Sequence, residues 1–173
     1  MKFKLLLASL LTTMSLSALT VGEIPKSLRI EGENGGNVKD DSAWSSQSLQ
    51  GKVTVLFYVD PDEKSVNEHF SKALHAKNYR DKGAFESVAI INLAATWKPN
   101  FVIEKILSAK QKDFKKTTYV KDKSSVLVKE WGMDDDASDI TLFNKEGRVL
   151  FYKSGKMSEA DIEKIYSLIE ENL

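Results

Sequence analysis

The hydrophobic pattern of residues 52–74 predicts a strand, a tight acidic turn and a helix. Residues 53–59 form an almost unbroken apolar run, rich in β-branched and aromatic side chains. Such a run is typical of a strand that is buried on both faces at the centre of a parallel sheet. Asp60-Pro61-Asp62 ends the strand because proline lacks a backbone donor, and Asp62 is the predicted N-cap of the following helix. That helix is predicted from an apolar stripe at helical spacing, formed by Val66, Phe70, Ala73 and Leu74.

Apolar runs and turn signals continue along the rest of the chain. Strands are predicted at residues 28–30, 87–94, 117–120, 140–143 and 149–152. Residues 34–37, Asn-Gly-Gly-Asn, form a strong turn signal. Residues 144–147 predict the turn of a β-hairpin, with Gly147 at the position that needs a positive φ.

Three further helices complete the pattern. One follows Pro99 and has an apolar face formed by Phe101, Val102, Ile106 and Ala109. A short helix is predicted over residues 123–131, ending at Gly132. The closing helix begins at Ser158 with a capping-box pattern, and its apolar stripe is formed by Ile162, Ile165, Tyr166 and Ile169.

Composition narrows the possible functions. The 173 residues suit one domain with its own core, and the chain contains no cysteine. With 25 basic and 25 acidic residues, no overall field draws the protein to nucleic acid or anionic lipid. The basic run from Lys105 to Lys116 also contains Asp113 and is interpreted as a solvated helix face. No helix-turn-helix pattern with a basic recognition helix is present, so we expect no nucleic-acid partner.

The first 20 residues have the order of a secretory signal peptide. Lys2 and Lys4 precede an apolar segment, which is followed by the small residues Ser15, Ser17 and Ala18. A membrane anchor would need about 20 predominantly apolar residues, and this segment is shorter and contains serine and threonine. We therefore predict a signal peptide at residues 1–18, a domain at residues 19–173, export to the periplasm and no membrane anchor after cleavage.

Short motifs along the chain resemble the thioredoxin-like fold of periplasmic thiol-disulfide proteins. The matching stretches are residues 22–25, 49–52, 120–122, 131–132, 142–149 and Gly155. Within that superfamily the chain resembles the YtfJ family of exported bacterial proteins, on the basis of residues 51–56, 91–92 and 144–149. The resemblance implies an α/β, three-layer sandwich with a mixed central sheet flanked by helices and an N-terminal hairpin extension.

The same resemblance excludes thiol redox chemistry. Asp62 and Ser65 stand where the superfamily has its two redox cysteines. Ser138 or Asp139 stands at the position of the cis-proline before the fourth strand of the fold. No thiolate can form in a chain without cysteine. Members of the YtfJ family lack a redox cysteine pair and have no settled molecular function.

Other candidate chemistry is weak at the level of sequence. His69 and His75 are six residues apart on the predicted helix, which places them about 120° apart around its axis, unsuited to sharing a metal ion. Ser65 would need His69 as a base, oriented by an acid. Trp97 and Trp131 would be able to stack a ligand, although core or hairpin packing is favoured for both. The sequence therefore predicts no catalytic residue, cofactor or metal site.

Acidic residues are the most informative polar feature. Asp60, Asp62 and Glu63 follow the first buried strand, and Asp134 to Asp136 with Asp139 precede the fourth. In a thioredoxin-like fold these loops are neighbours, and their carboxylates would repel one another without a cation or a basic partner. The candidate ligand or partner groove comprises Asp60, Pro61, Asp62, Glu63, Ser65, Asp136, Ser138 and Asp139.

Three functions remain open from the sequence. The first is a binding or adaptor module that takes a peptide or an envelope protein at this groove. The second is a divalent-cation site in the acidic loops, and the third is a cysteine-independent enzyme. Solvated loops that bind nothing are the alternative to all three, and the sequence leaves the oligomeric state open.

Overall fold

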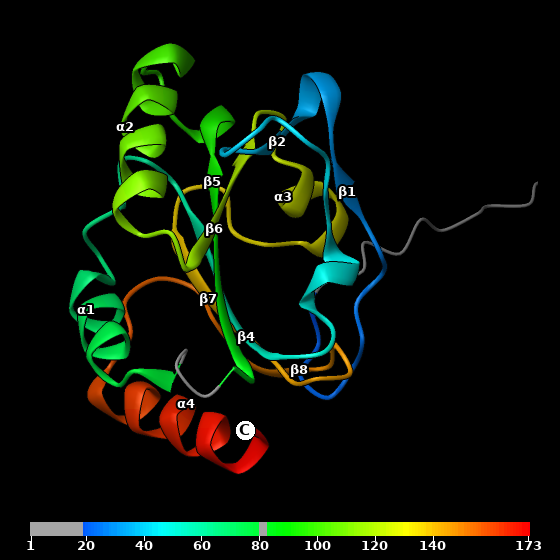
Figure 1. Ribbon diagram of the computed structural model, residues 1–173, viewed down its shortest axis with the longest axis vertical. Coiled ribbons are helices and arrows are strands. Elements are labelled where there is room, and N and C mark those ends of the chain that lie inside the picture. The colour runs from blue at the N-terminus through cyan, green and yellow to red at the C-terminus, as the bar shows by residue number, and fades with distance from the viewer. Residues whose placement is uncertain (1–18, 80–82) are drawn as a thin grey trace, which may run out of the picture.

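A six-stranded mixed sheet forms the centre of the computed structural model, which describes residues 19–79 and 83–173. The strands lie in the order β2-β6-β5-β4-β7-β8 (Figure 1). Their bounds are β2 (Gly35–Asn37), β4 (Val53–Val59), β5 (Phe85–Asn92), β6 (Thr117–Asp122), β7 (Ser138–Phe143) and β8 (Val149–Lys153). Strands β4, β5 and β6 are parallel, whereas β7 is antiparallel to both β4 and β8, and β2 is antiparallel to β6.

Helices cover both faces of the sheet and give three layers (Figure 1). Helices α1 (Glu68–Ala76) and α4 (Glu159–Asn172) pack on one face through Phe70, Leu74, Ile165 and Ile169. Helix α2 (Asn100–Asp113) lies on the same side. The other face carries α3 (Val126–Trp131) and a small antiparallel sheet of β1 (Arg29–Ile30) and β3 (Trp44–Ser45). This is the thioredoxin-like sandwich with an N-terminal hairpin that the sequence resemblance implies.

Strand β4 occupies the buried central position that its apolar run predicts. It pairs with β5 on one side and β7 on the other, and its side chains alternate between the two cores. Val53 and Val55 contact the core under α1 and α4, whereas Leu56 and Tyr58 contact the core under α3. The carboxyl ends of β4 and β5 therefore lie at one edge, where the candidate residues follow.

Several local predictions are confirmed. Ser158 and Asp161 form a capping box at the start of α4. Gly132 ends α3 in the left-handed conformation, and Gly147 has a φ of 81° in the turn between β7 and β8. Strand β5 ends at Asn92, two residues earlier than predicted, because residues 93–95 form a short 3-10 helix, η4 (Leu93–Ala95).

The predicted start of α1 is wrong. The helix begins at Glu68 after Asn67, and residues 61–67 form successive turns. Asp62 therefore caps no helix, and its backbone N–H donates to Asp60 Oδ1 at 2.8 Å within the first of these turns. Of the predicted stripe, Phe70 and Leu74 are buried, whereas Val66 is half-buried and Ala73 is exposed.

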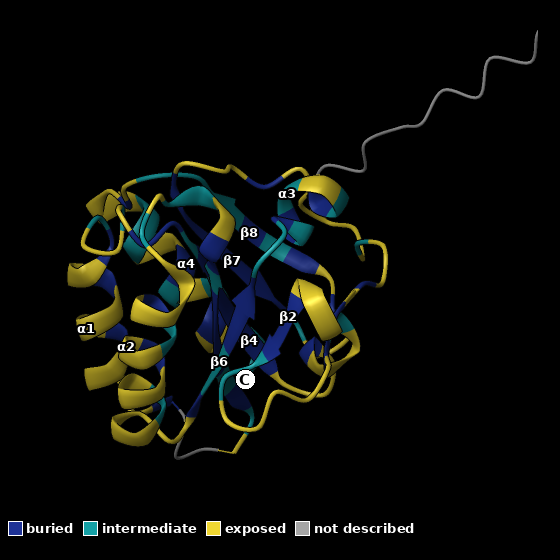
Figure 2. Ribbon diagram, turned by 90° about the horizontal axis from the view of Figure 1, so that it is seen from above, coloured by how far each residue is buried: buried dark blue, intermediate teal, exposed yellow. Residues whose placement is uncertain are grey.

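Helix α2 turns its predicted apolar face outward. Ile103 and Leu107 are its buried side chains and contact Leu93 in the core. Val38, Ile91 and Tyr119 pack against this small cluster, to which α2 contributes two residues at i and i+4. Figure 2 shows that α1 and α2 both present exposed outer surfaces over a buried sheet. The residues of the predicted stripe that are left exposed are Phe101, Val102, Ile106 and Ala109.

The turn predicted at residues 34–37 is also corrected, because Gly35–Asn37 forms edge strand β2. Gly35 approaches β6 so closely that a Cβ atom would lie 1.9 Å from the backbone oxygen of Lys121. The predicted signal peptide, residues 1–18, lies outside the described residues. Within residues 19–79 and 83–173, no helix is long and apolar enough to span a membrane.

Candidate functional site

The turn after β4 is fixed to the loop before β7. Asp60 is only 5% exposed, and its backbone N–H donates to the carbonyl of Ala137 at 2.9 Å. Pro61 is buried beside it. Burial, together with the charges of Asp136 and Glu63, raises the pKa of the Asp60 carboxyl. The two acidic loops are thus neighbours, as the sequence predicts.

Asp62 and Ser65, the two positions that the sequence resemblance aligns with the redox cysteines, have separate environments. Asp62 accepts a hydrogen bond from Thr96 Oγ1 at 2.7 Å and forms an ion pair with Lys98. Ser65 is exposed, and its carbonyl accepts from the N–H of Glu68 at 3.2 Å. Asp62 therefore connects the turn after β4 to the loop that leads into α2.

The start of β7 is closed by a buried asparagine. Asn67 Nδ2 donates to the carbonyls of Ser138 and Gly155, each at 2.9 Å, and its Oδ1 accepts from the N–H of Met157 at 2.9 Å. Ser138 is itself buried, and no cis peptide bond occurs within the described residues. The Ser138 carbonyl is consequently engaged by the side chain of Asn67.

Asp139 belongs to a different cluster from Asp60. Its side chain is fully buried, and Oδ2 accepts from the N–H of Asp134 at 2.9 Å and from the hydroxyl of Tyr152 at 3.0 Å. Oδ1 has no hydrogen-bond partner among the residues described. Burial raises the pKa of Asp139. Because successive residues of a strand point to opposite faces, Ser138 and Asp139 cannot join one site.

The run Asp134 to Asp136 is also divided. Asp134 accepts from Ser154 Oγ at 3.0 Å, whereas Asp135 Oδ1 accepts from Asn92 Nδ2 at 2.7 Å and from Ser125 Oγ at 3.2 Å. Asp136 is exposed. In the described part of the chain, no three histidine, aspartate or glutamate side chains converge so as to hold a metal ion. The geometry therefore gives no support to the cation-binding alternative.

The two histidines occupy separate places on α1. His69 Nε2 lies 3.2 Å from the carbonyl of Met157, so this nitrogen is engaged away from Ser65. The His75 ring meets the edge of the Phe114 ring at a centroid distance of 6.0 Å. Neither arrangement gives Ser65 the oriented base that nucleophilic catalysis requires.

Sequence reasoning missed an exposed apolar surface at the start of α2. Trp131 is fully buried and its Nε1 donates to the carbonyl of Lys26, as core packing predicts, but Trp97 is 86% exposed. Phe101 is 72% exposed. We call this surface the aromatic patch, comprising Trp97, Phe101, Val102 and Ile106. The sequence does contain a signal for this exposure. Ile103 and Leu107 are enough to fill the core contact of α2, so the residues of the predicted apolar stripe are not needed in the core.

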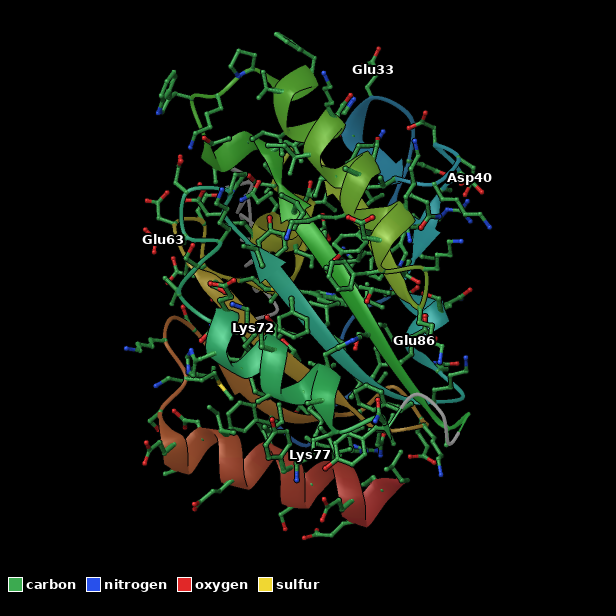
Figure 3. All side chains as sticks on the ribbon, turned by 60° about the vertical axis from the view of Figure 1, so that its left-hand side comes forward. Glu33, Asp40, Glu63, Lys72, Lys77 and Glu86 are labelled. Carbon is green, nitrogen blue, oxygen red and sulfur yellow. The ribbon has the colours of Figure 1, made fainter. Side chains whose placement is uncertain are left out.

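Opposite charges flank the aromatic patch. Lys98 joins the patch to the acidic turn, since it pairs with Asp62 and its Nζ lies 5.9 Å from the centre of the Trp97 ring. Glu63 projects from that turn at the edge of the molecule, apart from Lys72 on α1 (Figure 3). The far end of α2 is basic, with Lys110 and Lys112 in its last turn.

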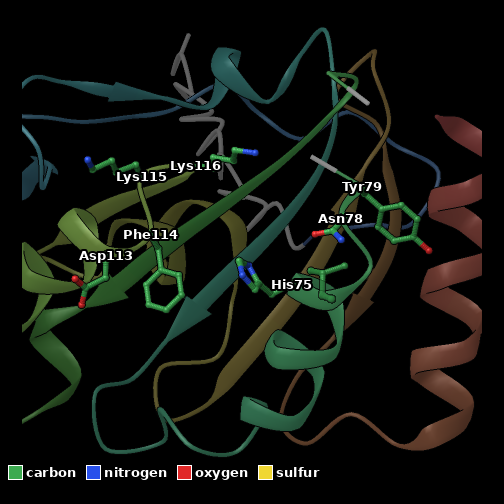
Figure 4. Close-up of a pocket in the computed structure, with 8 residues that line it drawn as sticks. His75, Asn78, Tyr79, Asp113, Phe114, Lys115 and Lys116 are labelled. Carbon is green, nitrogen blue, oxygen red and sulfur yellow. The ribbon is translucent and has the colours of Figure 1, made fainter. Parts of the chain in front are cut away.

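A cavity of about 390 Å³ lies between the carboxyl-terminal ends of α1 and α2. His75 and Phe114 face one another there (Figure 4). Its lining mixes the opposite charges of Asp113 and Lys115 with aromatic rings, and none of the sequence-predicted site residues belongs to it. This cavity therefore indicates no single ligand class.

Comparison with known proteins identifies the family. A family model described as "Bacterial protein of unknown function (YtfJ_HI0045)" matches residues 29–172. The chain belongs to the YtfJ_HI0045 family. An uncharacterised protein of Haemophilus influenzae is 29% identical over 130 residues, which cover 73% of this chain and 70% of that protein. The uncharacterised protein YtfJ of Escherichia coli K12 is 24% identical over 134 residues, covering 75% and 72% of the two chains.

Solved structures show the fold of this YtfJ_HI0045 family member. The thioredoxin domain of a thiol-disulfide oxidoreductase from Bacteroides vulgatus superposes with a TM-score of 0.60 at 10% identity, covering 88% of this chain and 99% of that domain. The likeness shows a thioredoxin-like fold. Because the chain has no cysteine, it is not a thiol-disulfide oxidoreductase.

Proposed function

We propose that this protein is a non-redox binding module of the bacterial envelope that associates with a protein partner through the aromatic patch. The observation that carries the proposal is the exposure of Trp97 at 86% and Phe101 at 72%. Aromatic side chains of this size dominate the energetics of protein interfaces, and Trp in particular is enriched at their centres. Of the candidate groove, Asp62 connects to the patch through Thr96 and Lys98.

The patch is held in place before any partner arrives. Thr96 and Lys98 on either side of Trp97 are both bound to Asp62. Pro99 then fixes the backbone at the entry to α2. A surface that is ordered in the free protein loses less conformational entropy on binding. The position that carries a cysteine in redox relatives therefore supports a binding surface here.

Site-specific photo-crosslinking in the bacterium tests this function. A photoreactive amino acid at position 97 should give a defined protein adduct, and one at the exposed hairpin residue Glu146 should not. The partner identified by mass spectrometry is then purified and titrated against the wild type, Trp97→Ser and Ile24→Ser. Ile24 is the matched control, because it is apolar and 51% exposed but lies outside the patch.

We expect Trp97→Ser to weaken binding by at least about tenfold, as truncation of an interface hot spot does, with no change for Ile24→Ser. Absence of an adduct at position 97 would count against the function. So would a partner whose affinity is the same for wild type and Trp97→Ser.

A further inference from the structure

We propose that the partner at the aromatic patch is a second copy of this chain, bound about a two-fold axis with the two α2 helices antiparallel. This inference rests on the proposed binding role of the patch. It goes further in naming the occupant, which is identified by the order of charges along α2.

One end of the patch is acidic. The backbone hydrogen bond from Asp60 to the carbonyl of Ala137, at 2.9 Å, holds the turn that carries Glu63 beside the loop that carries Asp136. Neither Glu63 nor Asp136 has an ion-pair partner within residues 19–79 and 83–173. Asp62 holds this acidic end against the start of α2 through Lys98.

The other end is basic. Helix α2 has 14 residues and is therefore about 20 Å long. Exposed Lys105 and Lys112 follow Phe101 on the same side of the helix. Neither of these two lysines has an ion-pair partner in the described part of the chain. The surface thus changes from acidic through apolar to basic in the direction of the helix.

Two-fold symmetry makes such a surface complementary to itself. In an isologous interface, each contact between residue i and residue j of the partner occurs twice. Rotation about an axis across the middle of α2 places the acidic turn of each copy at the basic end of the other. The apolar side chains then meet between the charged ends. Ala109, exposed and small, lies on the same face two turns after Phe101 and leaves room for an approaching aromatic ring.

Sedimentation velocity tests the inference directly, with the protein purified from the bacterial cells that produce it. A concentration series from about 1 to about 500 µM spans the range of weak and standard-sized interfaces. We expect the mass to double across the series relative to the chain mass measured under denaturing conditions. Trp97 provides a second signal, because Trp44 and Trp131 are 3% and 0% exposed and only Trp97 can lose water on association. Its fluorescence should shift to the blue as the dimer forms.

Variants locate the interface. Phe101→Ser and Ala109→Arg alter exposed side chains and should each raise the dissociation constant by at least about tenfold, whereas Ile24→Ser should not. Reversing one end, with Glu63→Lys and Asp136→Lys, or the other, with Lys105→Glu and Lys112→Glu, should weaken the dimer. Reversing both ends together should restore it, because the charges are then opposite again across the axis.

Three results would overturn the inference. They are a monomer throughout the concentration series, a dimer that is indifferent to Phe101→Ser and Ala109→Arg, and a doubly reversed variant no tighter than the single reversals. Thermal melts of each variant separate loss of association from loss of folding. A monomer that still gives a Trp97-dependent adduct with a different protein would contradict the two-fold dimer but leave the proposed function standing.

Discussion

At the level of single residues, Asp139 carries a carboxyl group where water cannot reach it. The side chain is fully buried and Oδ1 has no partner among the described residues. Burial raises its pKa in the folded protein above the value near 3.9 that is typical of an unfolded chain. The ionised form is therefore penalised by folding. The contribution of Asp139 to stability is greatest below its unfolded pKa. It declines as the pH rises through the interval up to the folded pKa.

We expect the free energy of unfolding of the wild type, relative to Asp139→Asn, to fall as the pH rises from 4 to 7. The slope can reach at most about 1.4 kcal/mol for each pH unit. Urea unfolding of both proteins at several pH values measures this difference. Asp161→Asn is the control, because the hydrogen bonds from Ser158 lower the pKa of Asp161 and give a dependence of opposite sign. If the difference in unfolding free energy between the wild type and Asp139→Asn did not change with pH, folding would not penalise the ionised form of Asp139.

Single residues also show how far the candidate site can be predicted. The sequence correctly places the turn at Asp60 beside the loop that ends at Ala137, because strand order alone determines which loops meet. It cannot place Asp139 and Ser138, whose side chains point to opposite faces and bind Tyr152 and Asn67 respectively. That separation depends on the register of β7, which only the folded sheet supplies.

Among the elements, strand β2 shows how a turn signal can be used for another purpose. Gly35 and Gly36 are typical of a hairpin turn, but here they let an edge strand approach β6 closely. The periodic stripe of α4 and its capping box are recognisable in sequence because both lie within one segment. Which side of α2 is buried depends on the core contact that Ile103 and Leu107 make with the rest of the fold. The local sequence pattern does not contain that information.

Gly35→Ala should destabilise the protein by about 3 kcal/mol or more, because the new Cβ meets the backbone of Lys121 at 1.9 Å and the residue has a φ of 123°. Gly32→Ala is the matched control. Its φ is 61° but a Cβ there has no neighbour within 4 Å, so we expect a cost of only about 1 kcal/mol. Urea unfolding gives both values. Equal losses in the two variants would mean that β2 does not depend on the close approach at Gly35.

At the scale of the whole molecule, the prediction of export rests on residues 1–18, which have the order of a signal peptide. We expect protein from an intact envelope fraction to begin near residue 19. Intact-mass spectrometry of that fraction, with the cytosolic fraction as the comparison, measures the length of the chain. Full-length protein confined to the cytosol would contradict both the cleavage and the envelope location.

One carboxylate, that of Asp62, connects the turn after β4 to the loop that leads into α2. Asp62 is partly exposed, so its ion pair with Lys98 contributes little to global stability, less than about 1 kcal/mol. Its structural effect is local, because Thr96 and Lys98 both depend on it to hold the loop that carries Trp97. Without these two contacts, the loop would become ordered only when the partner binds, and this ordering lowers the affinity.

We therefore expect Asp62→Ala to leave the melting temperature nearly unchanged while weakening association at the aromatic patch by up to about fivefold. Amide hydrogen exchange across residues 94–100 should become faster in the variant. Glu130→Ala is the matched control, because it removes an exposed ion pair of 2.6 Å with Lys26 at a site remote from α2. If exchange and association were the same in Asp62→Ala and Glu130→Ala, Asp62 would have no part in shaping the binding surface.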